Sequence, residues 1–304
     1  MGPYCVLRGR VNSVGFLPDE RLMSYLELAG FGSAALIRTF DLRYDLISVL
    51  VKRWRPETHA FHLSCGDCTI TLEDVALQLG LHIDGNAVTG VSSISMPAAL
   101  CYDLLGRLPI LPMNGRRYRR AYIIHLIGGV LMLDANDSTV HLMYLPLLSN
   151  LHNTRSYSWG SAVLAMLYRE LCRTTDPSAM DIGGCLILLQ CGHFTGYHSW
   201  HPLVTNHMYF HSTNPSIEKP YTVSIYHLMI ENHVGEGFGC IQYILTLPVR
   251  LGEIHGINRW GKHGNDWGEV HEEYITMWNN RLGKVPQMGR ALDLQPSLEY
   301  IQWY

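Results

Sequence analysis

The chain has 304 residues, of which 47% are hydrophobic, and its 26 acidic and 23 basic residues give a formal net charge of −3 at pH 7. This length and apolar content allow a substantial buried core, so the chain need not be disordered. The near balance of charge leaves nucleic acid open as a partner but gives it no support.

The sequence contains no signal for secretion, lipid attachment or membrane insertion. No basic segment precedes an apolar run at the N-terminus, and Val6 breaks the myristoylation pattern. The longest apolar stretch, residues 121–133, contains His125 and is shorter than the ~20 residues of a membrane span. Eight scattered cysteines fit a reducing compartment, so we expect a soluble intracellular protein without membrane contact.

The first half of the chain predicts two helices separated by a small hairpin. Apolar residues from Leu42 to Leu50 recur at helical spacing, and Pro56 forces the chain out of that helix. Residues 59–71 then predict a short hairpin, because apolar and polar residues alternate before a turn at Gly66-Asp67 and a β-prone stretch follows it. Thr71 and Asp74 resemble a capping box, which predicts a helix that ends at Gly80.

The remaining predicted elements are mostly helical. The stretch 118–133 is apolar on nearly every side, which predicts a central helix surrounded by others. Asp176-Pro177 is typical of the cap and first residue of a helix. The predicted helices span residues 97–105, 140–151, 159–173, 177–190 and 267–281, and residues 241–247 favour a strand.

Together these elements predict a mainly α fold, a helical bundle-like domain with a small β-hairpin near residues 59–71. We divide the chain into an N-terminal extension (1–38), the helical domain (39–285) and a C-terminal tail (286–304). Periodicity disappears between Cys191 and Pro220, where His, Tyr, Ser, Asn and Pro dominate.

Motifs for catalysis are incomplete, so no catalytic residue and no cofactor are predicted. Residues 256–262 match a phosphate-binding loop until His263 replaces the required hydroxyl. His271-Glu272 begins a zinc-protease helix, but Ile275 stands where the second histidine belongs. Ser161 lacks the G-x-S-x-G turn of many serine hydrolases and is expected to be a small packing residue.

Metal binding has one weak candidate site. Cys65 and Cys68 are spaced as zinc ligands, with His59 and His62 just upstream. This is half of a motif, and Cys191, His193, His198 and His201 could supply the other half. A hairpin turn with free thiols is the preferred interpretation, and we predict no bound metal.

Two groups of residues are candidates for partner binding. Trp54 and Arg55, with His62 on the hairpin, form a recognition surface if they are exposed, whereas burial of Trp54 would make them architecture. The second group is a basic cluster with Tyr118 inside it, where four positive charges at a helix start favour an anionic neighbour. Its residues are Arg116, Arg117, Arg119 and Arg120.

Several segments resemble the plant mobile domain, the family of MAINTENANCE OF MERISTEMS-like proteins. The run from Leu50 to His59, Leu-Val-Lys-Arg-Trp-Arg-Pro-Glu-Thr-His, carries much of the resemblance, which covers roughly two-thirds of the chain. The other segments are 61–63, 65–66, 69–76, 80–81, 84–85, 88–90, 121–130, 140–148, 157–162, 168–172, 182–185, 266–267 and 278–281. Residues 191–248 depart from the family pattern and are either divergent or a mispredicted segment.

The resemblance implies a plant protein of the nucleus, from a family found as host genes and inside transposable elements. It implies a non-catalytic interaction or scaffold role in meristem maintenance, transposon silencing and gene-expression control. Some family members are fused to or act with a phosphatase-7-like protein, but the G-D-x-H and G-N-H-E phosphatase signatures are absent here. The alternative is a transposon-derived or zinc-dependent nucleic-acid-binding enzyme.

Overall fold

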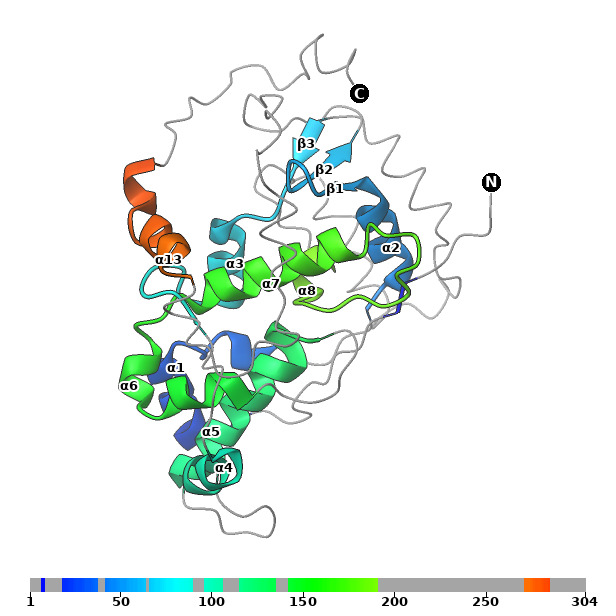
Figure 1. Cartoon of the computed structure of the whole chain (residues 1–304). Helices are drawn as coiled ribbons and strands as arrows, with labels where there is room; N and C mark the ends of the chain where they lie inside the picture. Colours follow the sequence, from blue (N-terminus) through cyan, green and yellow to red (C-terminus); the bar gives the residue numbers. More distant parts are fainter. Residues whose placement is uncertain are drawn as a thin grey trace, which may run out of the picture.

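The computed structural model describes residues 7–8, 18–37, 42–63, 66–89, 96–105, 115–134, 142–190 and 271–284, and the side chains of 115–118, 190, 282 and 284 lie outside that description. Within these ranges the chain is mainly helical with one small sheet, which confirms the predicted fold class (Figure 1). The elements are α1 Glu20–Ala29, η1 Ala34–Leu36, α2 Tyr44–Arg53, β1 Trp54–Arg55, β2 Ala60–Leu63, β3 Gly66–Cys68, α3 Leu72–Leu79, α4 Pro97–Leu105, α5 Gly115–Leu126, η2 Ile127–Leu131, η3 Leu142–Leu148, α6 Leu151–Thr154, α7 Trp159–Arg173, α8 Ile187–Gln190, α13 Glu272–Asn279 and η4 Arg281–Lys284.

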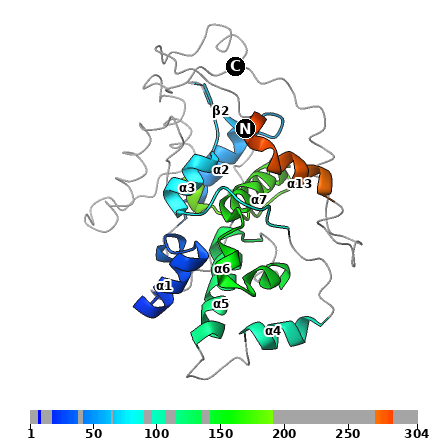
Figure 2. The same cartoon turned by 90° about the vertical axis from the view of Figure 1, so that its left-hand side faces the viewer.

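These elements gather at two ends of the molecule that share one core. In both views α1, α4, α5 and α6 lie at one end, and the sheet with α2, α3 and α7 lies at the other (Figures 1 and 2). The buried hydrophobic cluster includes Leu26 of α1, Leu50 of α2 and Leu167 of α7, so it runs through both ends. No helix in the described part of the chain is long and apolar enough to span a membrane.

Local signals define α2 and α3 as predicted. α2 ends where Trp54 adopts extended backbone two residues before Pro56. At the start of α3 the Thr71 hydroxyl accepts a hydrogen bond from Asp74 N–H, and the Asp74 carboxylate accepts one from Thr71 N–H at 2.7 Å. This capping box is complete, and Gly80 ends the helix in the left-handed conformation at φ 62°.

The sheet has three antiparallel strands in the order β1-β2-β3. Phe61 of β2 pairs with Trp54 of β1 on one side and with Cys68 of β3 on the other. The predicted turn at Gly66-Asp67 is wrong, because both residues lie in β3 and pair with Leu63 and His62. Burial of Cys68 in the core fixes this register in preference to the local turn tendency of the Gly-Asp pair.

The predicted central segment is confirmed over residues 121–133. α5 continues directly into the π-helical turn η2, and the buried side chains there include Ile123, Leu126 and Val130. α1, in the region predicted as an N-terminal extension, was not predicted as a helix. Asp19 caps α1 through Leu22 N–H, and α1 packs against α5 and α6.

Two predicted helices are corrected. Residues 142–148 form the 3₁₀ helix η3 with Pro146 inside it, and α6 follows as a separate short helix, because proline removes an α-helical hydrogen bond. The predicted helix 177–190 is reduced to α8, because Asp176 accepts hydrogen bonds from Ser178 and Gly184 has a φ of 80°. The expected strand at 241–247, the cap Asp266 and the tail 286–304 lie outside the described residues.

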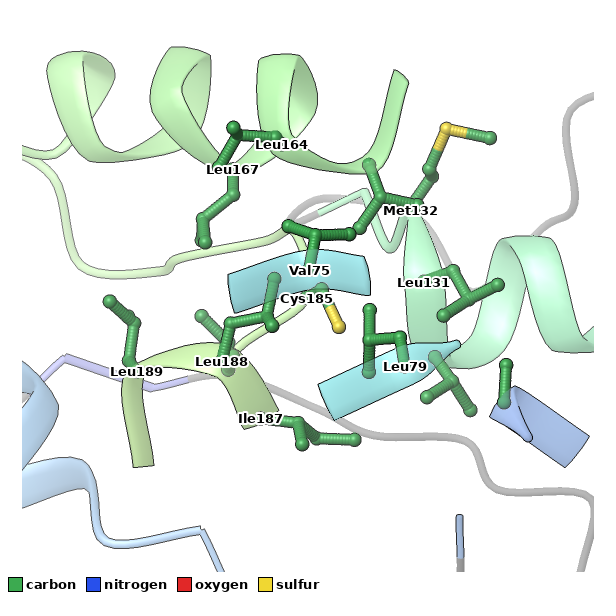
Figure 3. Packing of buried hydrophobic residues seen from close by; sticks show 14 of the residues in the cluster. Val75, Leu79, Leu131, Met132, Leu164, Leu167, Cys185, Ile187, Leu188 and Leu189 are labelled. Carbon is green, nitrogen blue, oxygen red and sulfur yellow. The ribbon is translucent and has the colours of Figure 1, made fainter. Parts of the chain in front are cut away.

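α7 runs beside α3, and their apolar faces meet in the core. Figure 3 shows Leu164 and Leu167 on α7 near Val75 on α3, with Leu188 of α8 below them. These four side chains are buried, and each contributes about 1.5–3 kcal/mol relative to an exposed side chain. α7 therefore holds the sheet, α3 and α8 as one unit.

Candidate functional site

The hairpin and α7 meet in an aromatic cluster centred on Trp54, which we call the hairpin cluster: Trp54, His59, Phe61, Tyr168 and Cys172. The Trp54 ring lies 4.8 Å from the Phe61 ring and 5.1 Å from the Tyr168 ring, centroid to centroid. Its Nε1–H donates a hydrogen bond to the Cys172 sulfur at 3.3 Å. Trp54 is only 1% exposed, so its polar atom has a partner inside the core.

The turn between β1 and β2 is held from α7. His59 adopts a φ of 50°, a left-handed conformation that costs a non-glycine residue about 1–2 kcal/mol. The Thr69 hydroxyl donates to the His59 carbonyl at 2.6 Å and also lies 2.7 Å from the Tyr168 hydroxyl. The His59 ring stacks near Trp54 and Tyr168. These contacts offset the backbone strain and fix the shape of the turn.

Burial changes the acid–base properties of this cluster. Burial raises the pKa of Tyr168 to about 12, so its hydroxyl stays protonated and donates to the Ile70 carbonyl at 2.6 Å. Burial also raises the pKa of the Cys172 thiol, although its hydrogen bond from Trp54 opposes the shift. A thiol that stays protonated at neutral pH is a weak nucleophile, so Cys172 serves packing rather than covalent chemistry.

The structure corrects the predicted recognition surface at the hairpin. Trp54 belongs to the core, and His62 is also buried, with 7% of its surface exposed. Arg55 is exposed, as is Glu57 in the turn that follows it. Trp54 and His62 therefore shape the hairpin from inside, and Arg55 with Glu57 remains as its outward-facing charged pair of residues.

The buried His62 predicts a pH-dependent stability. Burial lowers its pKa below the ordinary 6.5; Asp67 opposes this, Arg55 adds to it and Glu57 opposes it. Below pH 6.5 the unfolded chain therefore binds more protons at this site than the folded chain. We expect the free energy of unfolding to fall as pH is lowered from neutrality through that range.

Urea denaturation of the wild type and of His62→Gln at pH 7.5 and pH 5 measures this effect. Because the chain contains 16 histidines, the comparison between the two proteins isolates His62. The free energy of unfolding of the variant should depend less on pH than that of the wild type. An identical pH dependence in both proteins would contradict the assignment.

The basic cluster is partly used inside the fold. Arg120 donates from Nε to the Leu148 carbonyl at 2.9 Å and from Nη2 to the Ser149 carbonyl at 2.6 Å. It thereby caps the C-terminal end of η3. The Arg119 guanidinium lies over the Tyr25 ring of α1. Arg120 thus binds neutral backbone carbonyls, so the anionic neighbour expected for this cluster stays a prediction. The side chains of Arg116 and Arg117 lie outside the described residues.

The proposed zinc ligands are not brought together among the described residues. His62 Nε2 lies 3.2 Å from the Thr58 hydroxyl and 3.6 Å from Asp67, and the His59 ring packs on aromatic rings. The described residues contain no group of three or more His, Cys, Asp or Glu side chains placed to hold a metal ion. Cys65, Cys191, His193, His198 and His201 lie outside them.

A second contact joins two segments that sequence reasoning had treated separately. The loop after α3 covers the start of α7: Gly160 N–H donates to the His82 carbonyl at 2.9 Å, and the Ser158 hydroxyl donates to the Ile83 carbonyl at 2.6 Å. Ser161 donates to the same carbonyl at 3.1 Å, which fits its expected packing role. These carbonyls satisfy α7 donors in place of a side-chain cap.

Comparison with known proteins places this architecture in a family. The model of the plant mobile domain matches residues 30–233, which include both the hairpin cluster and the loop that covers α7. The chain belongs to the plant mobile domain family. No solved structure matches this chain.

Three Arabidopsis thaliana relatives show how far the similarity extends. The chain is 37% identical over 194 residues to Protein MAINTENANCE OF MERISTEMS, covering 56% of this chain and 41% of the relative. It is 38% identical to Protein MAIN-LIKE 1, covering 58% and 40% respectively. It is 42% identical to a serine/threonine-protein phosphatase 7 long form homolog, covering 49% of this chain and 13% of that protein. The chain thus matches less than half of each relative.

Proposed function

We propose that this plant mobile domain protein is a non-catalytic interaction module of the nucleus. The proposal rests on one observation: residues 50–59, which resemble the family, contribute Trp54 and His59 to the buried aromatic hairpin cluster. That cluster fixes a turn with Arg55 and Glu57 exposed on it. A rigid turn with exposed charges binds another protein at low entropic cost.

The biological setting is proposed from the relatives. One relative is named for the maintenance of meristems. We propose the same process for this protein, and we propose further that it acts through transposon silencing and gene-expression control. The phosphatase-named relative matches this chain over 13% of its length. We therefore propose a phosphatase-7-like protein as the partner.

Three described side chains with catalytic potential are compatible with the proposed role without chemistry. Cys172 keeps its proton, Tyr168 keeps its proton, and Ser161 is bonded to a backbone carbonyl. Each is explained by packing or by a structural hydrogen bond. A binding role needs none of them to react.

Affinity purification of the tagged protein from plant nuclei, with mass spectrometry and metal analysis of the same sample, tests this function. We expect a stoichiometric protein partner, and we expect Arg55→Ala with Glu57→Ala to reduce its recovery. Arg21→Ala with Glu27→Ala on α1 removes the same charges from another exposed site and is the matched control. Stoichiometric zinc with co-purifying nucleic acid, and no protein partner, would instead support the nucleic-acid enzyme.

A further inference from the structure

The helix α13 docks on the turn formed by Asp84 and Gly85, in the loop that follows α3 (Figure 1). Trp278 Nε1–H donates to the Gly85 carbonyl at 3.2 Å. Arg281 Nη2 lies 2.9 Å from Asp84 Oδ1, and its guanidinium carbon lies 3.9 Å from the centre of the Trp278 ring. One Trp and one Arg, three positions apart, thus bind one carbonyl and one carboxylate. Asp84 and Gly85 lie within the family match, residues 30–233, whereas Trp278 and Arg281 lie beyond its end.

The acceptor side of this contact is held rigidly. Gly85 has a φ of 109°, and Asn86 N–H donates to the Ser156 carbonyl at 2.8 Å. Ser158 N–H donates back to the Asn86 carbonyl at 2.9 Å. The turn is therefore attached to the start of α7 whether or not α13 is present. It presents the Gly85 carbonyl in a fixed position, with the exposed Asp84 carboxylate beside it.

The helix side is attached weakly. α13 contains no buried residue, and the Asp84 side chain is 66% exposed. An exposed ion pair contributes little, and a helix of eight residues is marginal in water without tertiary contacts. Tyr274 and Met277 of α13 are both exposed, so docking of this helix covers neither of them fully. Loss of this contact leaves the core intact.

We propose that the Asp84–Gly85 turn is a docking site for a helical segment that carries Trp and Arg three residues apart, and that the segment formed by α13 and η4 occupies it reversibly, with Trp278 on α13 and Arg281 at the start of η4. The partner that fits the site is a helix with an indole N–H directed at the Gly85 carbonyl and a guanidinium directed at Asp84. In this chain that helix is supplied in cis. The site is separate from the exposed residues Arg55 and Glu57. The docking proposal and the proposed function are therefore tested independently of each other.

A labelled synthetic peptide of residues 271–284 tests the site on the full chain. Trp278→Ala with Arg281→Ala vacates the turn, and this variant should bind the peptide about tenfold more tightly than the wild type, where α13 competes. Adding Asp84→Asn to the vacated chain should weaken binding about threefold, as expected for an exposed ion pair. A peptide carrying Trp278→Ala should bind about thirtyfold more weakly, whereas Met277→Ala is the control that should bind normally.

Hydrogen exchange of the intact wild type tests whether α13 is released. The α13 amides should exchange much faster than those of α7, and Trp278→Ala should accelerate only α13. The proposal is overturned if the peptide fails to bind the vacated chain, or binds the wild type and the vacated chain equally. It is also overturned if α13 is as protected as α7.

Discussion

Trp54→Ala is expected to lower the free energy of unfolding by about 3–5 kcal/mol, the usual cost of removing a buried Trp side chain. Trp54 is 1% exposed and packs against Phe61 and Tyr168, so its removal leaves a cavity between the hairpin and α7. The Cys172 sulfur also loses its indole donor. Chemical denaturation followed by far-UV circular dichroism measures this loss without depending on tryptophan fluorescence.

Trp278→Ala is the matched control for this experiment. Trp278 lies on α13, which contains no buried residue, so its removal should cost the core less than about 1 kcal/mol. Trp54→Phe keeps an aromatic ring but removes the donor to Cys172, and its cost should fall between those of the two alanine variants. Equal losses for Trp54→Ala and Trp278→Ala would refute the assignment of Trp54 to the core.

Gly85→Ala is expected to cost on the order of 2–4 kcal/mol, because two penalties add. Gly85 has a φ of 109°, a conformation that a residue with a Cβ rarely adopts. A Cβ there would also overlap the carbonyl of Ser156. That overlap involves backbone, so relief requires the loop to move away from the start of α7 and breaks the Asn86 to Ser156 hydrogen bond.

Gly283→Ala is the matched control, since a Cβ at Gly283 has no heavy atom within 4 Å. It should leave the midpoint of thermal unfolding unchanged, whereas Gly85→Ala should lower it. Hydrogen exchange at the Asn86 and Ser158 amides should be faster in the Gly85 variant, because Asn86 N–H donates to the Ser156 carbonyl and Ser158 N–H donates to the Asn86 carbonyl. A normal melting temperature for Gly85→Ala would show that the loop adapts freely and would contradict the rigid turn.

The elements predicted correctly from the sequence are those with a complete local signal. α3 carries its own capping box and its terminal Gly80, and α2 has an apolar face and a following Pro56. Residues 121–133 are apolar on nearly every side, which leaves burial as the stable outcome. These signals depend on neighbours within a few positions, so one sequence is enough to identify them.

One error arose where distant contacts compete with local tendencies, and two arose where a local signal was misread or overlooked. Gly66-Asp67 resembles a turn, yet both residues pair with β2 because burial of Cys68 sets the register. Asp176-Pro177 resembles a helix start, but the Asp176 carboxylate accepts hydrogen bonds from the Ser178 N–H and hydroxyl and forms a local turn instead. α1 escaped prediction although Asp19 caps it. The domain boundaries and the roles of Arg116 and Arg117 stay predictions.

The sequence by itself determined the helical class, the family resemblance and the position of the hairpin, because periodicity, caps and motif order are local properties. Only the tertiary structure decided which motif residues are exposed. Trp54 and Arg55 are adjacent in sequence, but alternation along β1 buries the first and exposes the second. The contact of Trp278 and Arg281 with the Asp84–Gly85 turn joins residues separated by 193 positions or more. Such a pairing depends on the packing of the whole chain.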